Sequence, residues 1–502
     1  MPGPRTMPAL LDDAARRFGT APAVATELTW AELREQVRTV SRAFAAIGIR
    51  AGDRVAVWSP NRVEFILALL GAECLGAALV PINTRYRGEE ARVILERSGA
   101  SALVLCNGFL GNDYLGMLDG CELPRLHTVI DLSGSALPWP EFLDRGASVP
   151  LSTITAAEQA VTPETVADIL YTSGTTGVPK GVMSTHRQTI GVAEVWARGA
   201  SLTPEDEYAI VNPFFHSFGY KAGVIAALTA GTTIHPVETF DPVALMGLIE
   251  RARITVLPGA PTLFTTLINH PRRTEFDLSS LRFAIAGAAT VPENLFADML
   301  EILGFDQVAQ AYGLTECVVA TQSRPHEDPQ HVAHTTGPAV PGLEIRIAAD
   351  GEILIRGEYV MLGYFDDPDA TAAAIDDGGW LHTGDAGCLD EHGCVKITGR
   401  LKDMFTVGGF NVYPAEVENV LSAHPDVVEA AVIGVADARL GSVGQAYVTL
   451  RPGATTAGLP DYCRERLANF KVPRSFVVLD EFPRNASGKI LKRDLAPGQP
   501  SR

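Results

Sequence analysis

A run of hydroxyl residues and glycines, closed by a lysine, is the stretch of this sequence whose side chains could most directly do chemistry. It spans residues 171–181 and reads Tyr-Thr-Ser-Gly-Thr-Thr-Gly-Val-Pro-Lys-Gly. The hydroxyls donate hydrogen bonds, the glycines let backbone N–H groups approach a ligand, and Lys180 adds positive charge. Such a loop is suited to phosphate oxygens. The residues that would bind them are Thr172, Ser173, Gly174, Thr175, Thr176, Gly177 and Lys180.

The loop differs from the P-loop of nucleotide hydrolases. That pattern needs a glycine five positions before Gly-Lys-Ser/Thr, with the lysine opening a helix. Here Pro179 precedes Lys180, Gly181 follows it, and Val182 begins a strand-like run. A solvated Ser/Thr/Gly turn is the alternative, and the length of the run weighs against it. We therefore expect a phosphate-binding loop of another type.

Further segments follow in an order that resembles the acyl-adenylate-forming enzymes along the whole chain. This superfamily contains the acyl-CoA synthetases, the adenylation domains of peptide synthetases and the beetle luciferases, and residues 171–181 look like its signature loop. Tyr312-Gly-Leu-Thr-Glu316 is specific, whereas the small-residue turn at 286–289 is weak alone, because many strand-ending turns look similar. The remaining segments are residues 212–219, 380–385, 399–418 and 483–493.

The resemblance implies an ATP site. Small residues at 287–289 would lie against the adenine, because only small side chains let a flat ring approach the backbone. Tyr312 would stack on that ring and Thr315 would bond the α-phosphate. Asp385 would accept hydrogen bonds from both ribose hydroxyls, and Arg400 would also touch the ribose. The implied adenine and phosphate residues are Gly287, Ala288, Ala289, Tyr312, Gly313 and Thr315.

The resemblance also implies magnesium on Glu316 and Thr172. Mg²⁺ takes one or two carboxylates and fills its other positions with phosphate oxygens and water. His216 would stand at the wall between nucleotide and acyl group, and the implied catalytic residues are Lys489, Glu316, Thr172 and His216. Taken alone, such a histidine is more often packed in a core, and an aspartate after glycine, such as Asp385, is more often a turn residue.

Two domains with a hinge between them are a further implication of the resemblance. Residues 1–399 would bind the acid and ATP, and residues 400–502 would form a small domain that swings about Lys402. Gly408 and Gly409 would line the passage for the pantetheine arm of coenzyme A, where a side chain would obstruct it. Lys489 matches the lysine that the family uses in adenylation. An ordinary loop and a solvated basic tail are the alternatives for single residues.

These residues together predict an ATP-dependent acyl-CoA synthetase, an AMP-forming acid–thiol ligase. A carboxylate is a poor acyl donor, so it is first joined to the α-phosphate of ATP with release of pyrophosphate, and a thiol then displaces AMP. Lys489, Mg²⁺ on Glu316 and the hydroxyl loop would oppose the repulsion between the two anions. Lys489 must then leave so that the thiol can enter, which requires two domain orientations.

The elements that must position these residues alternate between helix and strand. An N-cap Thr29 with Glu32 three residues later predicts a helix to about residue 47. Alternation of this kind builds a parallel or mixed sheet covered by helices. The predicted class is α/β, a large multi-layer domain followed by a small α+β domain, with residues 107–160 as a surface connection. Expected strands are 54–58, 78–80, 102–105, 168–171, 208–211, 254–257, 282–285, 430–433, 445–450 and 475–479; expected helices are 61–75, 89–97, 187–198, 414–424 and 459–470.

Composition limits the functions open to the chain. Its 502 residues exceed one compact core, so at least two units are expected. A net charge of -18 argues against nucleic acid or an anionic membrane as partner, because phosphate neutralisation needs clustered Lys and Arg. Scattered cysteines without CxxC spacing predict reduced thiols of a cytoplasmic protein, and no apolar stretch suits a signal peptide or a membrane span.

Other functions could use the same motifs. An amino-acid-adenylating enzyme expects an aspartate in the aromatic segment to pair with the substrate amine, and residues 212–219 contain none. Loading of a carrier protein expects a carrier domain after Lys489, and the sequence has none there. A luciferase-like monooxygenase would use the same adenylation motifs. A sensor that binds nucleotide or acyl-CoA without turnover should lack Glu316, Asp385 or Lys489, and all three are present.

The acid itself is the least determined part. Residues 216–223 and 287–292 resemble a group of actinobacterial ligases that activate the bicyclic indane-propanoate left by steroid-ring breakdown; a medium or long fatty acid is the alternative. Lys221 would be unusual beside a plain alkyl chain, because a buried ammonium needs a partner. It would either approach a ring ketone of the substrate or extend to solvent. A homodimer is compatible with the family.

Overall fold

The computed structural model of the chain describes residues 3–25, 27–172, 179–287, 291, 294–407, 410–437, 439–484 and 489–495. Its largest sheet has eight strands in the order β17-β9-β8-β4-β3-β5-β6-β7. The run from β8 to β7 is parallel, whereas β9 is antiparallel to both β8 and β17. The strands are β3 (Arg54–Trp58), β4 (Ala78–Pro81), β5 (Ala102–Leu105), β6 (Thr128–Asp131), β7 (Leu137–Pro138), β8 (Val166–Thr172), β9 (Lys180–Thr185) and β17 (Gly363–Tyr364).

Most of the helices around this sheet form where the sequence predicts them; residues 7–18 and 226–230 form two further helices that the sequence pattern does not predict. In α2 (Trp30–Ala46), the Thr29 hydroxyl accepts from the backbone of Glu32, whose carboxylate accepts from the Thr29 N–H, so the capping box is confirmed. A glycine in α3 lets α2 come close, since a Cβ at Gly71 would lie 2.7 Å from Val40 Cγ1. The other helices of this part are α1 (Met7–Phe18), α3 (Val63–Glu73), α4 (Gly88–Ser98), α8 (His186–Gly199) and α9 (Ala226–Ala230).

Two expectations about this region are wrong. Residues 107–160 are not only a surface connection, because β6 pairs in parallel with β5 inside the main sheet. Four-residue strands carry too little periodicity to be separated from loops by pattern alone. Residues 254–257 form no strand: Val256 makes single bridges to Tyr208 and Phe283. The helices within the supposed connection are α5 (Tyr114–Met117), α6 (Trp139–Arg145) and α7 (Leu151–Ala160).

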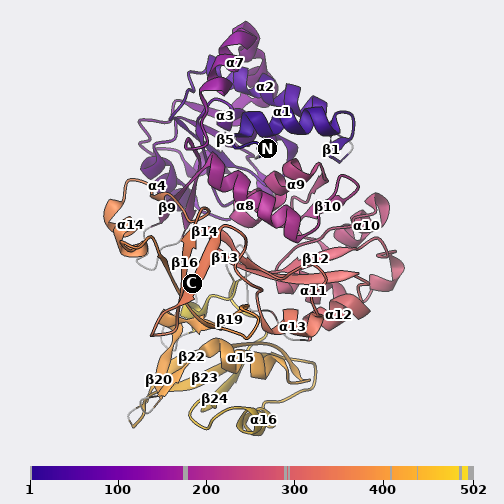
Figure 1. Cartoon of the computed structure of the whole chain (residues 1–502), viewed down its shortest axis with the longest axis vertical. Helices are drawn as coiled ribbons and strands as arrows, with labels where there is room; N and C mark the ends of the chain where they lie inside the picture. Colours follow the sequence, from indigo (N-terminus) through magenta and orange to yellow (C-terminus); the bar gives the residue numbers. More distant parts are fainter. Residues whose placement is uncertain are drawn as a thin grey trace.

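Three smaller sheets lie beside the main sheet (Figure 1). Their strands contain Tyr312, Asp385 and Arg400. One has the order β10-β11-β1-β2, a second β12-β13-β14, and a third, antiparallel, β15-β16-β18-β19. Their strands are β1 (Pro22–Val24), β2 (Leu28–Thr29), β10 (Glu207–Ile210), β11 (Thr233–Pro236), β12 (Phe283–Ala286), β13 (Gln307–Leu314), β14 (Cys317–Gln322), β15 (Leu343–Ile347), β16 (Glu352–Gly357), β18 (Leu381–Leu389) and β19 (Val395–Arg400). Helices α10 (Pro242–Ala252), α11 (Pro261–Ile268), α12 (Leu295–Glu301), α13 (Pro329–His334) and α14 (Pro368–Ala374) complete this part.

The C-terminal part is a small α+β unit, drawn in orange and yellow at the bottom of Figure 1. Its sheet has the order β21-β20-β23-β22, with β24 parallel to β23, and buried residues such as Val417, Val432 and Val448 form its own core. The predicted α/β class with a small α+β unit is therefore confirmed. The elements are β20 (Phe405–Val407), β21 (Phe410–Val412), α15 (Pro414–Ser422), β22 (Val427–Asp437), β23 (Gly441–Leu450), α16 (Leu459–Arg466) and β24 (Ser475–Val478).

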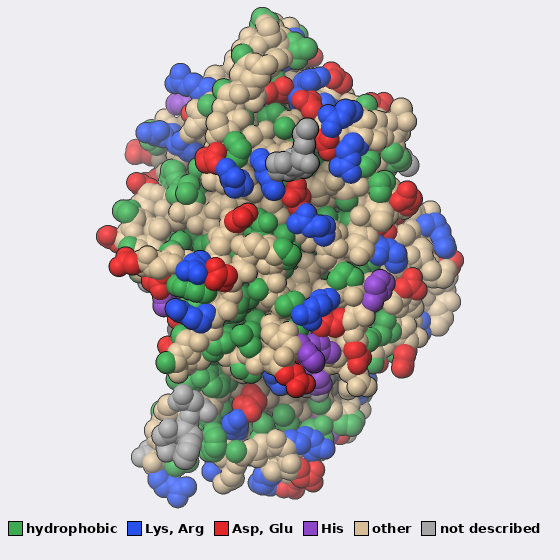
Figure 2. All heavy atoms as spheres, in the orientation of Figure 1, with side chains coloured by type: hydrophobic (Ala, Val, Ile, Leu, Met, Phe, Trp, Pro, Cys, Tyr) green, Lys and Arg blue, Asp and Glu red, His purple; other side chains and the backbone are tan. Residues whose placement is uncertain are grey.

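The surface carries charged side chains of both signs. On the face drawn in Figure 2, basic and acidic side chains are interspersed, without a continuous basic surface that nucleic acid would need. Among the described residues, none of the helices has both the length and the apolar composition that crossing a bilayer requires.

Candidate active site

The turn between β13 and β14 presents Thr315 and Glu316. The two strands are paired up to the residues on either side, which leaves these two as a tight turn. Gly313 permits the close approach of the strands, because a Cβ at this position would lie 2.0 Å from the Val318 carbonyl oxygen. The segment predicted to hold phosphate and metal is therefore the tip of a hairpin.

Tyr364 brings Glu316 and Lys180 together. Its hydroxyl donates a 2.7 Å hydrogen bond to Glu316 Oε1, and the ammonium of Lys180 lies 4.9 Å from the centre of its ring. Burial and the Glu316 charge raise the pKa of Tyr364, which keeps the hydroxyl a donor. Tyr364 lies in β17, which pairs with β9 immediately after Lys180. Lys180 of the loop and Glu316 of the hairpin thus both contact Tyr364, which belongs to none of the motifs in the sequence.

Asp385 is held between Tyr312 and Arg400. Its Oδ2 accepts from the Tyr312 hydroxyl at 2.7 Å, and its Oδ1 lies 3.0 Å from Arg400 Nε. Asp385 and Arg400 are direct partners across β18 and β19, so the hairpin itself sets their distance. Desolvation and the Asp385 charge raise the pKa of Tyr312. The two residues that the sequence predicts at a ribose are therefore adjacent, beside the residue predicted at the adenine.

Lys489 lies within electrostatic reach of this pair. Desolvation and the charge of Arg400 lower the pKa of Lys489, whereas Asp385 and Asp403 favour its charged form. The lysine predicted for adenylation is therefore close enough to Asp385 and Arg400 for their charges to act on it. Lys402 lies in the one-turn 3₁₀-helix Leu401–Asp403 that follows β19, and its side chain is exposed.

His216 is neutral and oriented by its own segment. Burial lowers its pKa, and its Nδ1 accepts a 3.2 Å hydrogen bond from the Phe218 N–H, so its remaining proton is on Nε2. Asn61 fixes the segment before it. The Asn61 amide accepts from the Phe214 N–H at 2.7 Å and donates to the Asn212 carbonyl at 3.0 Å. The sequence predicts only that a helix starts at Asn61, because the partners of its amide lie some 150 residues away.

Lys221 forms a buried ion pair. It lies on the π-helix Phe218–Ile225, is 1% exposed, and its ammonium lies 2.9 Å from Asp168 Oδ1 and 2.7 Å from Ser184 Oγ. The expectation that it extends to solvent is wrong. The partner that a buried ammonium requires is a protein carboxylate, so its burial gives no separate reason to place a substrate ketone beside it.

A second buried pair adjoins the first. The Tyr220 hydroxyl donates a 2.6 Å hydrogen bond to Glu73 Oε1, and the Thr189 hydroxyl donates at 2.7 Å to the other oxygen of Asp168. Desolvation raises the pKa of Glu73, which favours its neutral form. Asp168 is the one charged residue in the apolar strand β8. It is the feature of the sequence that points to such a network, because a buried carboxylate needs partners.

The predicted residues divide into those the structure joins and those it does not describe. Glu316 and Lys180 meet at Tyr364, whereas Tyr312, Asp385 and Arg400 form a second group whose charges act on Lys489. Thr172 ends β8 opposite Lys180. A Cβ added at Gly287 would come no closer than 3.5 Å to another atom, which leaves space beside that backbone. The predicted residues outside the described ranges are Ser173, Gly174, Thr175, Thr176, Gly177, Ala288, Ala289, Gly408 and Gly409.

Two family descriptions match the chain. Residues 11–365 match "AMP-binding enzyme", and residues 416–489 match "AMP-binding enzyme C-terminal domain". Among solved structures, the anthranilate CoA ligase AuaEII in complex with anthranoyl-AMP is 26% identical with a TM-score of 0.87, covering 99% of this chain and 97% of that one. ATP-bound MatB from Rhodopseudomonas palustris is 29% identical with a TM-score of 0.85, covering 97% and 98%.

Curated relatives extend the match over the whole chain. A 7a-methyl-1,5-dioxo-octahydro-1H-inden-4-yl propanoyl:CoA ligase of Rhodococcus jostii is 50% identical over 98% of both chains. The protein of the same description from Mycobacterium tuberculosis is also 50% identical over 98% of both. A putative acyl-CoA synthetase, YngI of Bacillus subtilis, is 36% identical over 93% of this chain and 91% of its own length. The chain thus belongs to the AMP-binding enzyme family and is an AMP-forming acid–CoA ligase.

Proposed function

We propose that this ligase activates a bicyclic, oxo-substituted propanoic acid of the indane-propanoate kind. The observation that carries the proposal is the 50% identity to two ligases of that acid, each matched over 98% of both chains. Medium-chain acyl-CoA ligases are more distant, at 31% identity over 93% of the chain for the human protein. The fatty acid named as an alternative from the sequence is therefore less well supported.

In the proposed ATP site, the nucleotide lies between the two groups of residues described above. Tyr312 provides the flat ring for the adenine, and Asp385 accepts from the ribose hydroxyls through lone pairs that Tyr312 and Arg400 leave free. Lys180, with residues 172–177 of the loop, neutralises phosphate charge. The support is the proximity of residues from distant segments in one region: Asp385 contacts both Tyr312 and Arg400, and Glu316 shares Tyr364 with Lys180.

Magnesium fits the donor set at Glu316. The carboxylate is half-buried, and the Tyr364 hydroxyl occupies one acceptor site on Oε1, which leaves further acceptor sites for a hard cation. Glu316 and the hydroxyl of Thr172 would hold the ion, which would neutralise phosphate charge during attack by the acid. Tyr364 would fix the orientation of the Glu316 carboxylate.

The two half-reactions require different positions of Lys489. In the first, its ammonium stabilises the charge between carboxylate and α-phosphate, and its proximity to Asp385 and Arg400 supports this arrangement. For thioester formation, residues 400–502 turn about Lys402 relative to residues 1–399, and Gly408 and Gly409 open a path for coenzyme A. His216 would lie beside the acyl group. Its neutral ring can contact an apolar substrate without burying an unpaired charge.

We propose that the enzyme is located in the cytoplasm. All seven cysteines are free thiols, which suits a reducing compartment. We also propose a homodimer, which size measurement of the purified protein would test.

A panel of acids tests the substrate. Purified protein with ATP, Mg²⁺, CoA and one acid is followed by release of AMP and pyrophosphate. The panel contains the methyl-dioxo-indane propanoate, its analogue without ring ketones, octanoate, palmitate and an amino acid. The proposal expects the bicyclic diketo acid to give the highest kcat/KM. Equal or better turnover with octanoate or palmitate would overturn it. Lys489→Ala is the control for AMP that arises without acid activation.

A further inference from the structure

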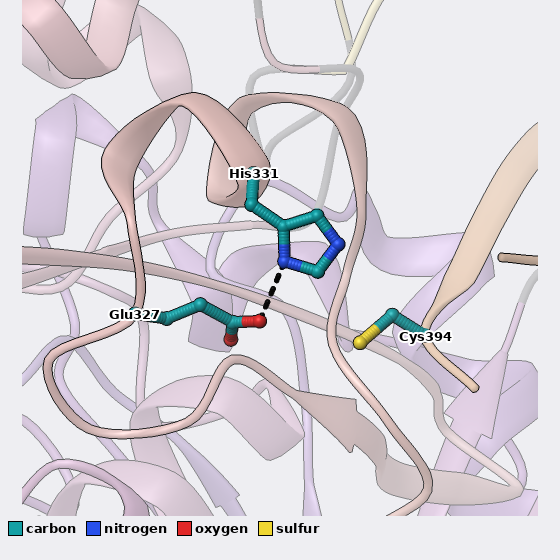
Figure 3. A group of neighbouring side chains, drawn as sticks. All are labelled: Glu327, His331 and Cys394. Carbon is teal, nitrogen blue, oxygen red and sulfur yellow. Dashed lines mark hydrogen bonds and ion pairs between the residues drawn. The ribbon is translucent and has the colours of Figure 1, made fainter. Parts of the chain in front are cut away.

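Three side chains of metal-ligand type meet outside the active site. They are Glu327 in the loop after β14, His331 on α13 and Cys394 at the turn that leads into β19. Their ligand atoms all lie within 4.8 Å of one another. Figure 3 shows the carboxylate, the imidazole and the thiol pointing toward a common space. Glu327 and His331 are four residues apart, whereas the fold brings Cys394 to them from a distant turn, so local spacing marks only part of the cluster.

The imidazole of His331 is oriented as a metal ligand usually is. Its Nδ1 faces Glu327 Oε1 at 2.6 Å, and its Nε2 lies 2.7 Å from Asp390 Oδ2. A carboxylate on the second ring nitrogen fixes the tautomer and increases the basicity of the first, which is the arrangement behind most histidine ligands of zinc. Asp390 is itself held, because its other oxygen accepts from the N–H of Cys394 at 2.8 Å.

The sulfur completes the ligand set. Cys394 is fully buried, whereas His331 and Glu327 are partly accessible, so an ion could enter from their side. We propose that Glu327 Oε1, His331 Nδ1 and Cys394 Sγ bind one Zn²⁺, with water as the fourth ligand. Tetrahedral zinc separates such atoms by about 3.3 to 3.6 Å, so the carboxylate and imidazole would move apart by less than about 1 Å. In the empty site the imidazole Nδ1 donates its proton to Glu327, so both this nitrogen and the thiol give a proton to solvent when zinc binds.

Arg324 competes for the same place. Its Nη1 lies 3.6 Å from Glu327 Oε1 and 3.7 Å from Cys394 Sγ, and its side chain is 52% exposed. A guanidinium there partly neutralises the two acidic groups, and an exposed side chain can turn outward at little cost. Removal of Arg324 should therefore strengthen zinc binding. If the acidic groups only needed the positive charge of the guanidinium, removal of Arg324 would instead destabilise the cluster.

The location predicts an effect on stability. Zinc would link the loop that contains Glu327, and helix α13 after it, to the tip of the hairpin formed by β18 and β19. Asp385 and Asp390 are five residues apart, or about 16 Å along an extended strand. The site is thus too distant to contact the substrates, and bound zinc should raise the midpoint of thermal unfolding without being needed for turnover.

The test titrates the chelator-treated, full-length protein with Zn²⁺ against a chromogenic chelator. Native protein and Cys388→Ser, which alters an exposed cysteine of β18, should bind one equivalent. Cys394→Ser and His331→Gln should bind at least tenfold more weakly, and Arg324→Ala more tightly. Absence of competitive binding by native protein, or equal affinities of Cys394→Ser and native protein, would overturn the proposal.

Cobalt gives a readout that does not depend on stability. Co²⁺ bound to native protein should show a sulfur-to-cobalt charge-transfer band in the near ultraviolet, because the proposed site contains a thiolate. The band should persist in Cys388→Ser and vanish in Cys394→Ser. A band that vanishes instead in Cys388→Ser would place the metal elsewhere and refute the assignment.

Discussion

The Tyr312 hydroxyl lies 2.7 Å from Asp385 Oδ2, on the side of the carboxylate opposite Arg400. Tyr312→Phe keeps the ring and removes this bond, and a hydrogen bond to a charged group contributes about 1.5–3 kcal/mol. We expect KM for ATP to rise about tenfold or more, with less change in KM for the acid. Steady-state kinetics check this. Tyr114→Phe, which loses a buried bond to the Thr84 carbonyl, is the matched control. An unchanged KM for ATP would show that the hydroxyl does not organise Asp385.

Lys489 and Lys402 should separate the two half-reactions. Lys489→Ala should slow acyl-AMP formation by a factor of about 100 or more, the scale for loss of one preorganised contact, and leave thioester formation from synthetic acyl-AMP largely intact. Lys402→Pro restricts the backbone that must rotate, so it should form acyl-AMP and fail to make the thioester, provided that the frozen conformer is the adenylating one. Pyrophosphate and thioester are followed separately. Parallel loss of both activities in both folded variants would contradict the two-orientation mechanism.

The buried pair of Lys221 and Asp168 should respond non-additively to substitution. Lys221→Met leaves a buried carboxylate without its cation, which should lower the free energy of unfolding by about 3–5 kcal/mol. Adding Asp168→Asn should recover part of this loss. Urea denaturation measures both variants. Lys471→Met, which breaks a more accessible pair with Glu416, should cost about 1 kcal/mol or less. Additive effects of the two buried substitutions would show that the pair is not coupled.

His186 should make stability depend on pH. Burial lowers its pKa from 6.5 to about 4, and the Met7 N–H donates to its Nδ1. The unfolded state therefore binds the proton more readily, so the contribution is complete above the unfolded pKa and is lost as the pH falls toward 4. The loss from about pH 7.5 to about pH 5 should be about 2 kcal/mol.

The pH effect is checked by comparing urea unfolding of native protein and His186→Gln at both pH values. The amide of glutamine can accept the Met7 N–H and does not titrate. The native protein should lose more stability than the variant by the stated amount. The same pH dependence in both proteins would assign the effect to other groups.

Local signals explain which parts were predictable from the sequence. The capping box at Thr29 and Glu32 and the apolar strands β3, β4 and β5 depend on neighbours in sequence, and they form as expected. The Tyr312 and Trp380 segments could be identified because each motif is contiguous. Tyr364 could not, since its role comes from pairing with β9 and from a contact with Glu316 across the fold. A buried lysine at position 221 would need a partner, but the sequence does not identify it. The partner, Asp168, is brought to Lys221 only by the tertiary fold.

The pairing of Lys221 with Asp168 constrains how the acid preference of this enzyme can evolve. The π-helix that carries Lys221 begins two residues after His216, which we propose lies beside the acyl group, so substitutions in this helix are natural choices for altering the acid preference. A change at 221 alone leaves a buried charge, and a change at 168 alone does the same, so each single step passes through an unstable protein. Descendants that change position 221 should therefore carry a correlated replacement at position 168, and libraries that vary the two together should yield folded variants that single-site libraries miss.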